Sequence, residues 1–344
     1  PLNEENPQQT QVGALTYVGG WALQSHTPAF GGWSGMVRTG NKLIAISDNG
    51  HWLRANLAPA LTATYNVPAH TPTPIDGTAS SHDTAAPAEA ADTAPQGALT
   101  AGTPPTEALP SLALVSTPFE TARMGSFAGR DSLENAKASF DAEEIIAAPY
   151  GYLISFEQDH RLVFTEAPGA PMTQVDLPEG TTAALSPNGG FEAMTWDADN
   201  RLLLFVEEGR DTNGLLPLRR ITTKGSEKSL ETFKLDVAVG FAPTAARLLP
   251  DGGILLIARA FNVNEGVRII IGHIRADDYA ALTPSGTLSV RELARLKTPY
   301  SVDNMEALEL LQLGEGGKVR FAILSDDNKN NFQRTLFMVF DAQL

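Results

Sequence analysis

Five polar residues recur at matching places along this chain, and each stands directly before a short apolar run. A turn rich in Asp, Asn or Gly follows each run, and a second apolar run then ends at another polar residue. Two short strands around such a turn predict a β-hairpin. The five opening residues are Ser34, Glu143, Glu192, Thr244 and Glu306. The residues that close the second runs are Asp48, Glu157, Glu207, Arg259 and Asp326.

Three of the opening residues are glutamates, and superposed copies would bring their carboxylates toward one axis. Two ionised groups about 5 Å apart repel by roughly 3 kcal/mol at an effective dielectric of about 20, so three of them need a cation, a proton or a basic partner. Hard oxygen ligands suit Ca²⁺, with Mg²⁺ as the alternative. We therefore predict a metal site whose ligands are Glu143, Glu192, Asp303, Asn304 and Glu306.

One basic residue interrupts the acidic series. Arg259 stands where the other copies place an acid. A guanidinium at this point would neutralise the carboxylates or hold a phosphate oxygen with two hydrogen bonds. The alternative to a metal is that the glutamates bond to amides of neighbouring elements, or pair with Arg259 or Arg247. Both interpretations stay open on the sequence alone.

Polar clusters that follow the second runs add further candidates, although turn chemistry explains such composition almost as well. In one cluster His160 and Arg161 are adjacent, and they would serve as an acid and an anion clamp. The predicted ligand-binding residues are Ser34, Asp48, His160, Arg161, Asp326, Asp327 and Asn328. The predicted catalytic residues are Glu143, Glu192, Arg259 and Glu306. The chain has no P-loop, no zinc-protease HExxH and no nucleophile elbow.

The spacing of the copies predicts an all-β fold, a β-propeller. From Glu143 onward the copies start roughly 50 to 60 residues apart, which is the length of a four-stranded blade with its loops. About 110 residues separate Ser34 from Glu143, so six blades are favoured and five are the alternative. A strand over residues 14–23 should pair with one over 335–340 and close the ring, so that residues 12–344 form one domain.

Composition excludes several classes of function. The net charge of −15 makes nucleic acid and anionic lipid improbable partners, because both bind basic surfaces. The chain has no cysteine and no apolar run long enough to span a membrane. Residues 55–117 are rich in Ala, Pro and Thr and lack hydrophobic periodicity, which indicates a flexible insertion within the domain.

Several motifs together resemble the phytase-like family described as "esterase-like activity of phytase". They are FGGWSGM at 30–36, SDNG at 47–50, DAEE at 141–144, NGGFEAM at 188–194, FAPTAARLLPDG at 241–252, VDNMEAL at 302–308 and SDDN at 325–328. The resemblance implies a β-propeller, export to the bacterial periplasm and hydrolysis of phosphate or carboxylic esters. The chain departs from the family pattern at Glu144, where a small residue is usual, and at Ala245, where Asp is expected.

Two functions follow as expectations. The first is a periplasmic or secreted hydrolase in which metal-assisted water attacks a small-molecule ester or phosphoester at the carboxylate ring. The second is a noncatalytic propeller that binds a ligand or a protein partner and carries only a structural metal. Few basic residues lie near the motifs, which argues against phytate as the substrate.

Overall fold

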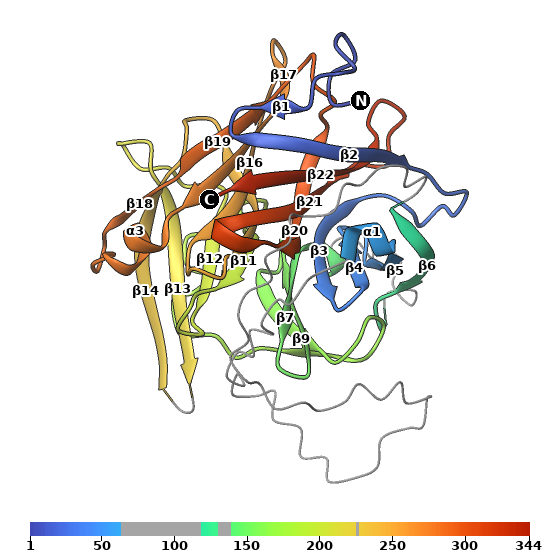
Figure 1. Cartoon of the computed structure of the whole chain (residues 1–344). Coiled ribbons are helices and arrows are strands. Elements are labelled where there is room, and N and C mark those ends of the chain that lie inside the picture. The colour runs from blue at the N-terminus through green and yellow to red at the C-terminus, as the bar shows by residue number, and fades with distance from the viewer. Residues whose placement is uncertain (63–117, 130–138, 225–226) are drawn as a thin grey trace.

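A computed structural model describes residues 1–62, 118–129, 139–224 and 227–344, and within them the strands form five sheets (Figure 1). We number these sheets as blades 1 to 5. Blade 1 consists of β3 (Trp33–Thr39), β4 (Lys42–Ser47), β5 (His51–Leu57) and β6 (Phe119–Ser126). Blade 2 consists of β7 (Ala142–Ala148), β8 (Gly151–Phe156), β9 (Arg161–Thr165) and β10 (Met172–Gln174).

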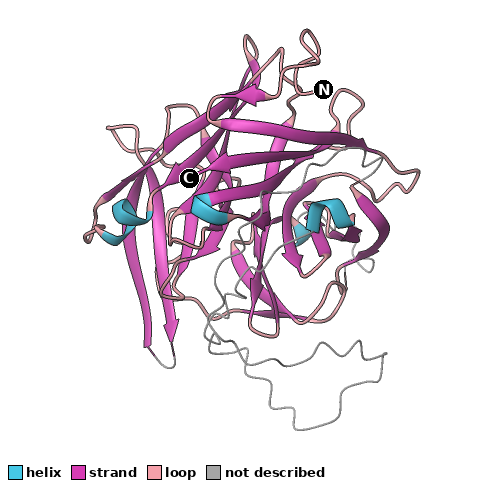
Figure 2. Cartoon of the chain, viewed as in Figure 1, coloured by secondary structure: helices cyan, strands magenta, loops and turns pink. Residues whose placement is uncertain are grey.

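The other three blades follow in chain order. Blade 3 consists of β11 (Phe191–Trp196), β12 (Leu202–Val206), β13 (Leu216–Lys224) and β14 (Glu227–Asp236), with β18 (Thr287–Ser289) added in parallel to β14. Blade 4 consists of β15 (Ala242–Leu248), β16 (Ile254–Asn262), β17 (Gly266–Ile274) and β19 (Arg291–Leu296). Blade 5 consists of β20 (Asn304–Leu313), β21 (Lys318–Asp326), β22 (Thr335–Gln343), β2 (Leu15–Leu23) and β1 (Gln11–Val12). Short helical segments, α1 (Pro59–Thr62), α3 (Ala276–Ala280) and η2 (Glu315–Gly317), connect strands (Figure 2).

The first strands of the five blades line a central channel. Strand β3 contacts β7, which contacts β11, and the series continues through β15 and β20 back to β3. Because β3 and β7 touch directly, no blade fits between them, and the favoured number of six blades is wrong. The long interval between Ser34 and Glu143 instead holds residues 58–118, which connect the third and fourth strands of blade 1. The alternative of five blades is confirmed.

Ring closure follows the predicted pairing of the two ends of the chain. Strand β2 pairs antiparallel with β22, with Leu23 opposite Thr335 and Tyr17 opposite Phe340. The domain also begins earlier than predicted, because Leu2 is fully buried and its carbonyl accepts a hydrogen bond from the Ser301 amide.

The hydrophobic core of the described residues is divided among the contacts between blades. Five clusters of buried side chains occur, one for each neighbouring pair of blades. Leu203 and Phe205 of β12, for example, pack toward blade 4, whereas Leu202 and Leu204 pack toward blade 2. Successive side chains of β12 point to opposite faces of the sheet, and both faces are buried against a neighbouring blade. This explains why the sequence of such a strand is continuously apolar.

The strand directions give the propeller two distinct ends. All five inner strands begin at one end, which we call the mouth, and each second strand returns to it. The predicted insertion starts at the other end: residues 55–57 belong to β5, and most of the remainder, 63–117, lies outside the described residues. No helix among the described residues has the length and apolar composition needed to cross a bilayer.

Candidate functional site

The five repeated polar residues occupy equivalent positions on the inner strands, and we call them the bulge ring. In every blade the pairing of the first two strands shifts register at this residue, as at Ser34 between Trp33 and Gly35. The members are Ser34, Glu143, Glu192, Thr244 and Glu306. A β-bulge places one extra residue on the inner strand and redirects its side chain. The bulge therefore explains why a polar residue interrupts an apolar strand at the same point in each copy.

Hydroxyl groups fix the backbone beside each glutamate of the bulge ring. Ser34 Oγ donates to the carbonyl of Ala142, at 2.5 Å, and Thr244 Oγ1 donates to that of Met305, at 2.9 Å. Ser155 Oγ of β8 donates to the carbonyl of Phe191, also at 2.9 Å. The three carbonyls belong to the residues that precede Glu143, Glu306 and Glu192. Each glutamate is thus positioned by a hydroxyl of the preceding blade.

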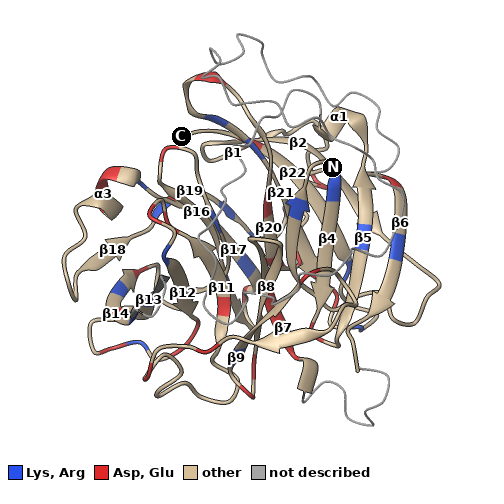
Figure 3. Cartoon of the chain, turned by 90° about the horizontal axis from the view of Figure 1, so that it is seen from below, with Lys and Arg blue, Asp and Glu red and all other residues tan. Residues whose placement is uncertain are grey.

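A second series of polar residues lies at or near the ends of the second strands, and we call it the strand-end ring. Arg259 lies within its strand, because β16 continues to Asn262. Each member follows the residue that pairs with the one before the bulge: Asp48 follows Ser47, which pairs with Trp33. The members are Asp48, Glu157, Glu207, Arg259 and Asp326. Both rings lie at the mouth, and acidic positions on β7, β11 and β20 surround the centre in Figure 3.

The carboxylates of the two rings form two clusters that share one residue. Oxygen atoms of Asp141, Glu143 and Glu157 lie within 4.8 Å of one another, and so do those of Glu157, Glu192 and Glu207. Asp141, which precedes the bulge of blade 2, joins the site although its role was not predicted. Oxygen donors at this separation can share a hard cation such as Ca²⁺. Glu157 would then belong to both ligand sets.

Burial and mutual repulsion disfavour the ionised forms of these acids. Burial, followed by the charges of Glu192 and Glu157, raises the pKa of Glu143 well above its usual value. Burial and Asp326 do the same for the pKa of Glu306, which Arg259 only partly offsets. Burial and Glu192 raise the pKa of Glu207 to about 10. In the absence of a cation Glu207 therefore holds its proton at neutral pH, and the ionised forms of Glu143 and Glu306 are disfavoured.

Arg259 is the basic member of the strand-end ring, and its contacts are loose. Its Nη2 lies 3.9 Å from Glu192 Oε2 and 3.8 Å from Glu306 Oε1. Its Nε is buried and has no hydrogen-bond partner. Burial lowers the pKa of Arg259, but the charges of Glu306 and Glu192 outweigh it, and the pKa is raised. The guanidinium is therefore charged and retains donor capacity for an anionic oxygen.

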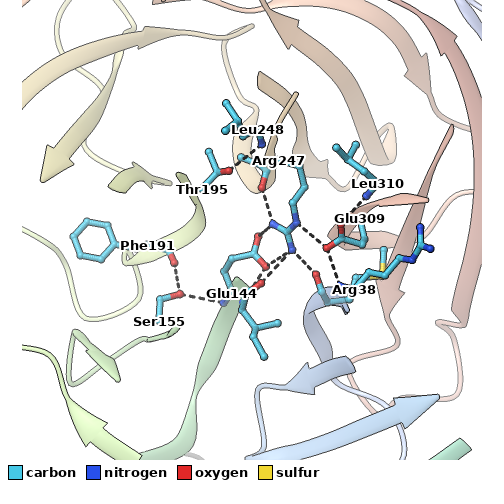
Figure 4. Close-up of polar contacts among 12 residues, drawn as sticks. Arg38, Glu144, Ser155, Phe191, Thr195, Arg247, Leu248, Glu309 and Leu310 are labelled. Carbon is cyan, nitrogen blue, oxygen red and sulfur yellow. Dashed lines mark hydrogen bonds and ion pairs between the residues drawn. The ribbon is translucent and has the colours of Figure 1, made fainter. Parts of the chain in front are cut away.

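A second arginine of blade 4 lies deeper in the channel and has no such capacity (Figure 4). Arg247 Nη1 contacts Glu144 Oε2 at 3.0 Å, and Arg247 Nε contacts Glu309 Oε2 at 3.1 Å. Its other donors bond to the carbonyls of Met36, Ile145 and Ala246. These partners belong to four of the five blades. The Arg247 network thus links blades 1, 2, 4 and 5 below the rings, and Glu144, the residue that departs from the family pattern, is one of its members.

The remaining predicted metal ligands, Asp303 and Asn304, lie beside the rings. Asp303 Oδ1 accepts from Gln333 Nε2 and from the Asn304 amide, and Asp303 Oδ2 accepts from the Arg334 amide. These donors hold the loop that follows β21 and saturate the carboxylate. Asn304 Nδ2 donates to Glu306 Oε1 at 2.6 Å, so this amide orients a ring glutamate.

Of the predicted ligand-binding residues, those that end β21 organise the turn at the mouth. Asp326 accepts from the Asn328 amide, and Asp327 accepts from the amide of Gly32 and from Thr335. Asn328 itself has a positive φ of 45°, typical of a turn residue. Asp327 thereby links blade 5 to blade 1 across the closure of the ring.

The predicted pair His160 and Arg161 borders a separate cavity of about 460 Å³ on the rim of blade 2, lined mainly by residues 174–182. Arg161 donates to the carbonyls of Asp159 and Ser139, which occupies its donors. His160 Nε2 bonds to the Ser186 carbonyl, and its buried Nδ1 has no partner. Arg161 thus lies on the rim, whereas His160 also lies beside Glu157: a Cβ on Gly190 would come within 3.0 Å of His160 Nδ1 and 3.1 Å of Glu157 Cγ.

Comparisons with known proteins give weakly similar solved structures and one family model. The chain is similar to a protein of unknown function from Dyadobacter fermentans, at 10% identity and a TM-score of 0.41, over 96% of this chain and 99% of that one. It is also similar to the β-propeller domain of Cps50 (Swd1) from Myceliophteria thermophila, at 11% identity and a TM-score of 0.38, over 90% and 82% of the two chains. No functionally curated protein matches the chain. Residues 28–329 match the model of the phytase-like family described as "esterase-like activity of phytase", and the chain therefore belongs to that family.

Proposed function

We propose that this protein hydrolyses a phosphate or carboxylic ester at the mouth of the channel, with a Ca²⁺ ion held by the carboxylate clusters. The observation that carries the proposal is the juxtaposition of two acidic clusters, which share Glu157, with the incompletely bonded Arg259. Membership of the phytase-like family supports the reaction class. Mg²⁺ remains the alternative cation.

The donor set fits a hard cation. All the side chains of the two clusters offer carboxylate oxygens, which Ca²⁺ prefers. Protein donors orient two of these carboxylates: the Gly190 amide bonds to Glu157 Oε1, and Gln158 Nε2 bonds to Asp141 Oδ2. A bound Ca²⁺ would polarise the ester and lower the pKa of a water molecule. Glu143, Glu157 and Glu192 are the residues that we expect to hold it.

Side chains of the two rings would bind the substrate and transfer protons. Arg259 binds an anionic oxygen of the substrate through its Nε and Nη2 and stabilises the charge that develops there. Burial and Glu192 raise the pKa of Glu207 to about 10, so Glu207 is protonated at neutral pH and would donate its proton to the oxygen that leaves. Glu192, on the neighbouring inner strand, would accept the proton of the attacking water.

The test is hydrolysis of p-nitrophenyl acetate and p-nitrophenyl phosphate by chelator-treated protein, with and without added calcium. We expect calcium-dependent release of p-nitrophenol that Glu192→Gln abolishes. Asp176→Asn is the matched control, because this exposed acid lies outside the rings and pairs with Lys228. No turnover of either ester, combined with intact calcium binding, would support the noncatalytic binding function instead.

Family membership also supports export to the periplasm as part of this proposal. Fractionation of the native host, with this protein followed by immunoblotting, tests it. Recovery in the cytoplasmic fraction alone would reject it.

A further inference from the structure

Exposed apolar side chains gather at the mouth of the propeller. In the described part of the chain five large hydrophobic side chains are exposed. Four of them lie at the mouth end, Phe261 near the end of β16 and the others in connections: Val239, Phe261, Val263 and Phe332. The fifth, Tyr150, lies in the turn between β7 and β8 at the opposite end. Single exposed hydrophobic residues are ordinary on protein surfaces, but a group on one functional face is informative.

Phe261 stands on the same strand as Arg259. Side chains two positions apart on a strand share a face, and the ladder of β16 with β17 is regular from Ile254 to Asn262. Phe261 therefore lies on the Arg259 side of β16, farther out along the mouth, and it is 65% exposed. The hairpin of β16 and β17 extends beyond the rings, on the same side of the molecule as the N-terminus in Figure 1.

Phe332 belongs to the adjacent blade and to a loop with a defined conformation. The loop spans residues 327–334 and follows Asp326 of the strand-end ring. Asp303 holds Arg334 and Gln333, and Asn330 Oδ1 accepts from the Phe332 amide. The Phe332 side chain is nevertheless 97% exposed. A well-bonded loop thus presents an aromatic ring to solvent beside the mouth.

We infer that the substrate is an ester with a large apolar group, which Phe261 and Phe332 contact while Arg259 and the acidic clusters hold the ester itself. This inference rests on the proposed function and narrows its substrate class. Charge favours the same occupant: the two rings contain seven acids, one serine, one threonine and a single arginine, so a highly charged polyanion would be repelled. An apolar tail carries no such penalty and covers the two rings.

Binding of two probes tests the inference independently of turnover. Methylphosphonate and octylphosphonate share an anionic head and differ in the apolar tail. Calorimetric titration of the calcium-loaded protein should show at least about tenfold tighter binding of octylphosphonate, because burying several methylene groups contributes to affinity. The double variant Phe261→Ser, Phe332→Ser should reduce that preference to within about twofold and leave methylphosphonate affinity unchanged. Tyr150→Ser is the matched control at the opposite end and should retain the full preference.

Several results would overturn the inference: equal affinity for the two probes, no binding of either, or a preference that survives in the double variant. A preference lost equally in Tyr150→Ser would do so as well. Ester hydrolysis separates this inference from the proposed function. Turnover without any chain-length preference rejects only the apolar substrate, whereas a preference in binding without turnover rejects only the hydrolase.

Discussion

Arg247 and Arg259 both belong to blade 4 and both face glutamates of other blades, yet their surroundings differ sharply. Arg247 has two carboxylate partners at 3.0 and 3.1 Å and several carbonyl partners, and it is only 7% exposed. Arg259 approaches its glutamates no closer than 3.8 Å and has an unpartnered Nε. A saturated network holds blades together, whereas an unsaturated one retains the capacity to bind a ligand.

The largest expected effect is the loss of Arg247. Arg247→Met leaves Glu144 and Glu309 buried without their counter-ion, and we expect the free energy of unfolding to fall by about 3–5 kcal/mol. Urea denaturation at neutral pH measures it. The triple variant with Glu144→Gln and Glu309→Gln removes the unpaired charges and should recover part of the loss. A change below about 1 kcal/mol in Arg247→Met would contradict the structural role of this network.

Arg259 should show the opposite balance between activity and stability. Arg259→Gln removes the clamp for the anionic oxygen, and we expect kcat/KM for the ester to fall about 100-fold. Stability of the calcium-loaded protein should change by less than about 1 kcal/mol, because the ion pairs are long and partly exposed. Arg259→Lys keeps the charge, and its kcat/KM should lie between those of the wild type and Arg259→Gln. Unchanged kcat/KM in Arg259→Gln would remove this residue from the mechanism.

The raised pKa values predict how stability depends on pH. Glu207 has a pKa of about 10 in the folded protein, against 4.5 for the usual value. Between these values the folded state holds a proton that the unfolded chain has released, so stability falls as pH rises. We expect the Glu207 proton alone to cost the metal-free protein about 1.4 kcal/mol of stability per pH unit between pH 6 and 8.

Thermal unfolding across this range, with and without calcium, measures the slope. Glu207→Gln should make it shallower by close to one proton, and calcium should flatten it by favouring the ionised carboxylates. A metal-free melting temperature that rises with pH would show that the acids of the rings are ionised at neutral pH.

The smallest effect concerns a hydroxyl beside the rings. Ser155→Ala removes the bond to the Phe191 carbonyl and the acceptor for the Glu144 amide, and we expect a loss of about 1 kcal/mol. Because Phe191 precedes Glu192, calcium affinity should fall as well, by less than about tenfold. Ser289→Ala, in an exposed position, is the control. Ser155→Ala with unaltered stability and affinity would show that this hydroxyl positions nothing.

Much of the site was predictable because it repeats. The hairpin pattern placed Ser34 and Glu192 at one position in every blade, and it identified Glu207 and Arg259 as a second series. The repeat also showed that Arg259 is positively charged at a position where the other copies have an acid. The repeat was enough to predict the members of both rings, because each bulge recurs at the same place in its hairpin.

What the pattern could not give depends on contacts between distant blades. Arg247 and Glu144 are 103 residues apart, and nothing local to either indicates the pair. The saturation of Asp303 likewise depends on a loop 31 residues away. The number of blades was wrong because a connection within blade 1 was long enough to contain another blade. The number of residues between two copies of the pattern therefore does not show whether they form another blade or a connection.

Calcium titration of chelator-treated protein by calorimetry tests the central claim most directly. The wild-type chain should bind calcium, Glu157→Gln should lose most of the affinity because it removes a ligand of both clusters, and Glu144→Gln should bind as the wild type does. At a hundredfold excess over the dissociation constant, calcium should also stabilise the wild-type fold by about 2.7 kcal/mol. Absence of binding, or equal affinity in Glu157→Gln and the wild type, would contradict a cation site in the rings.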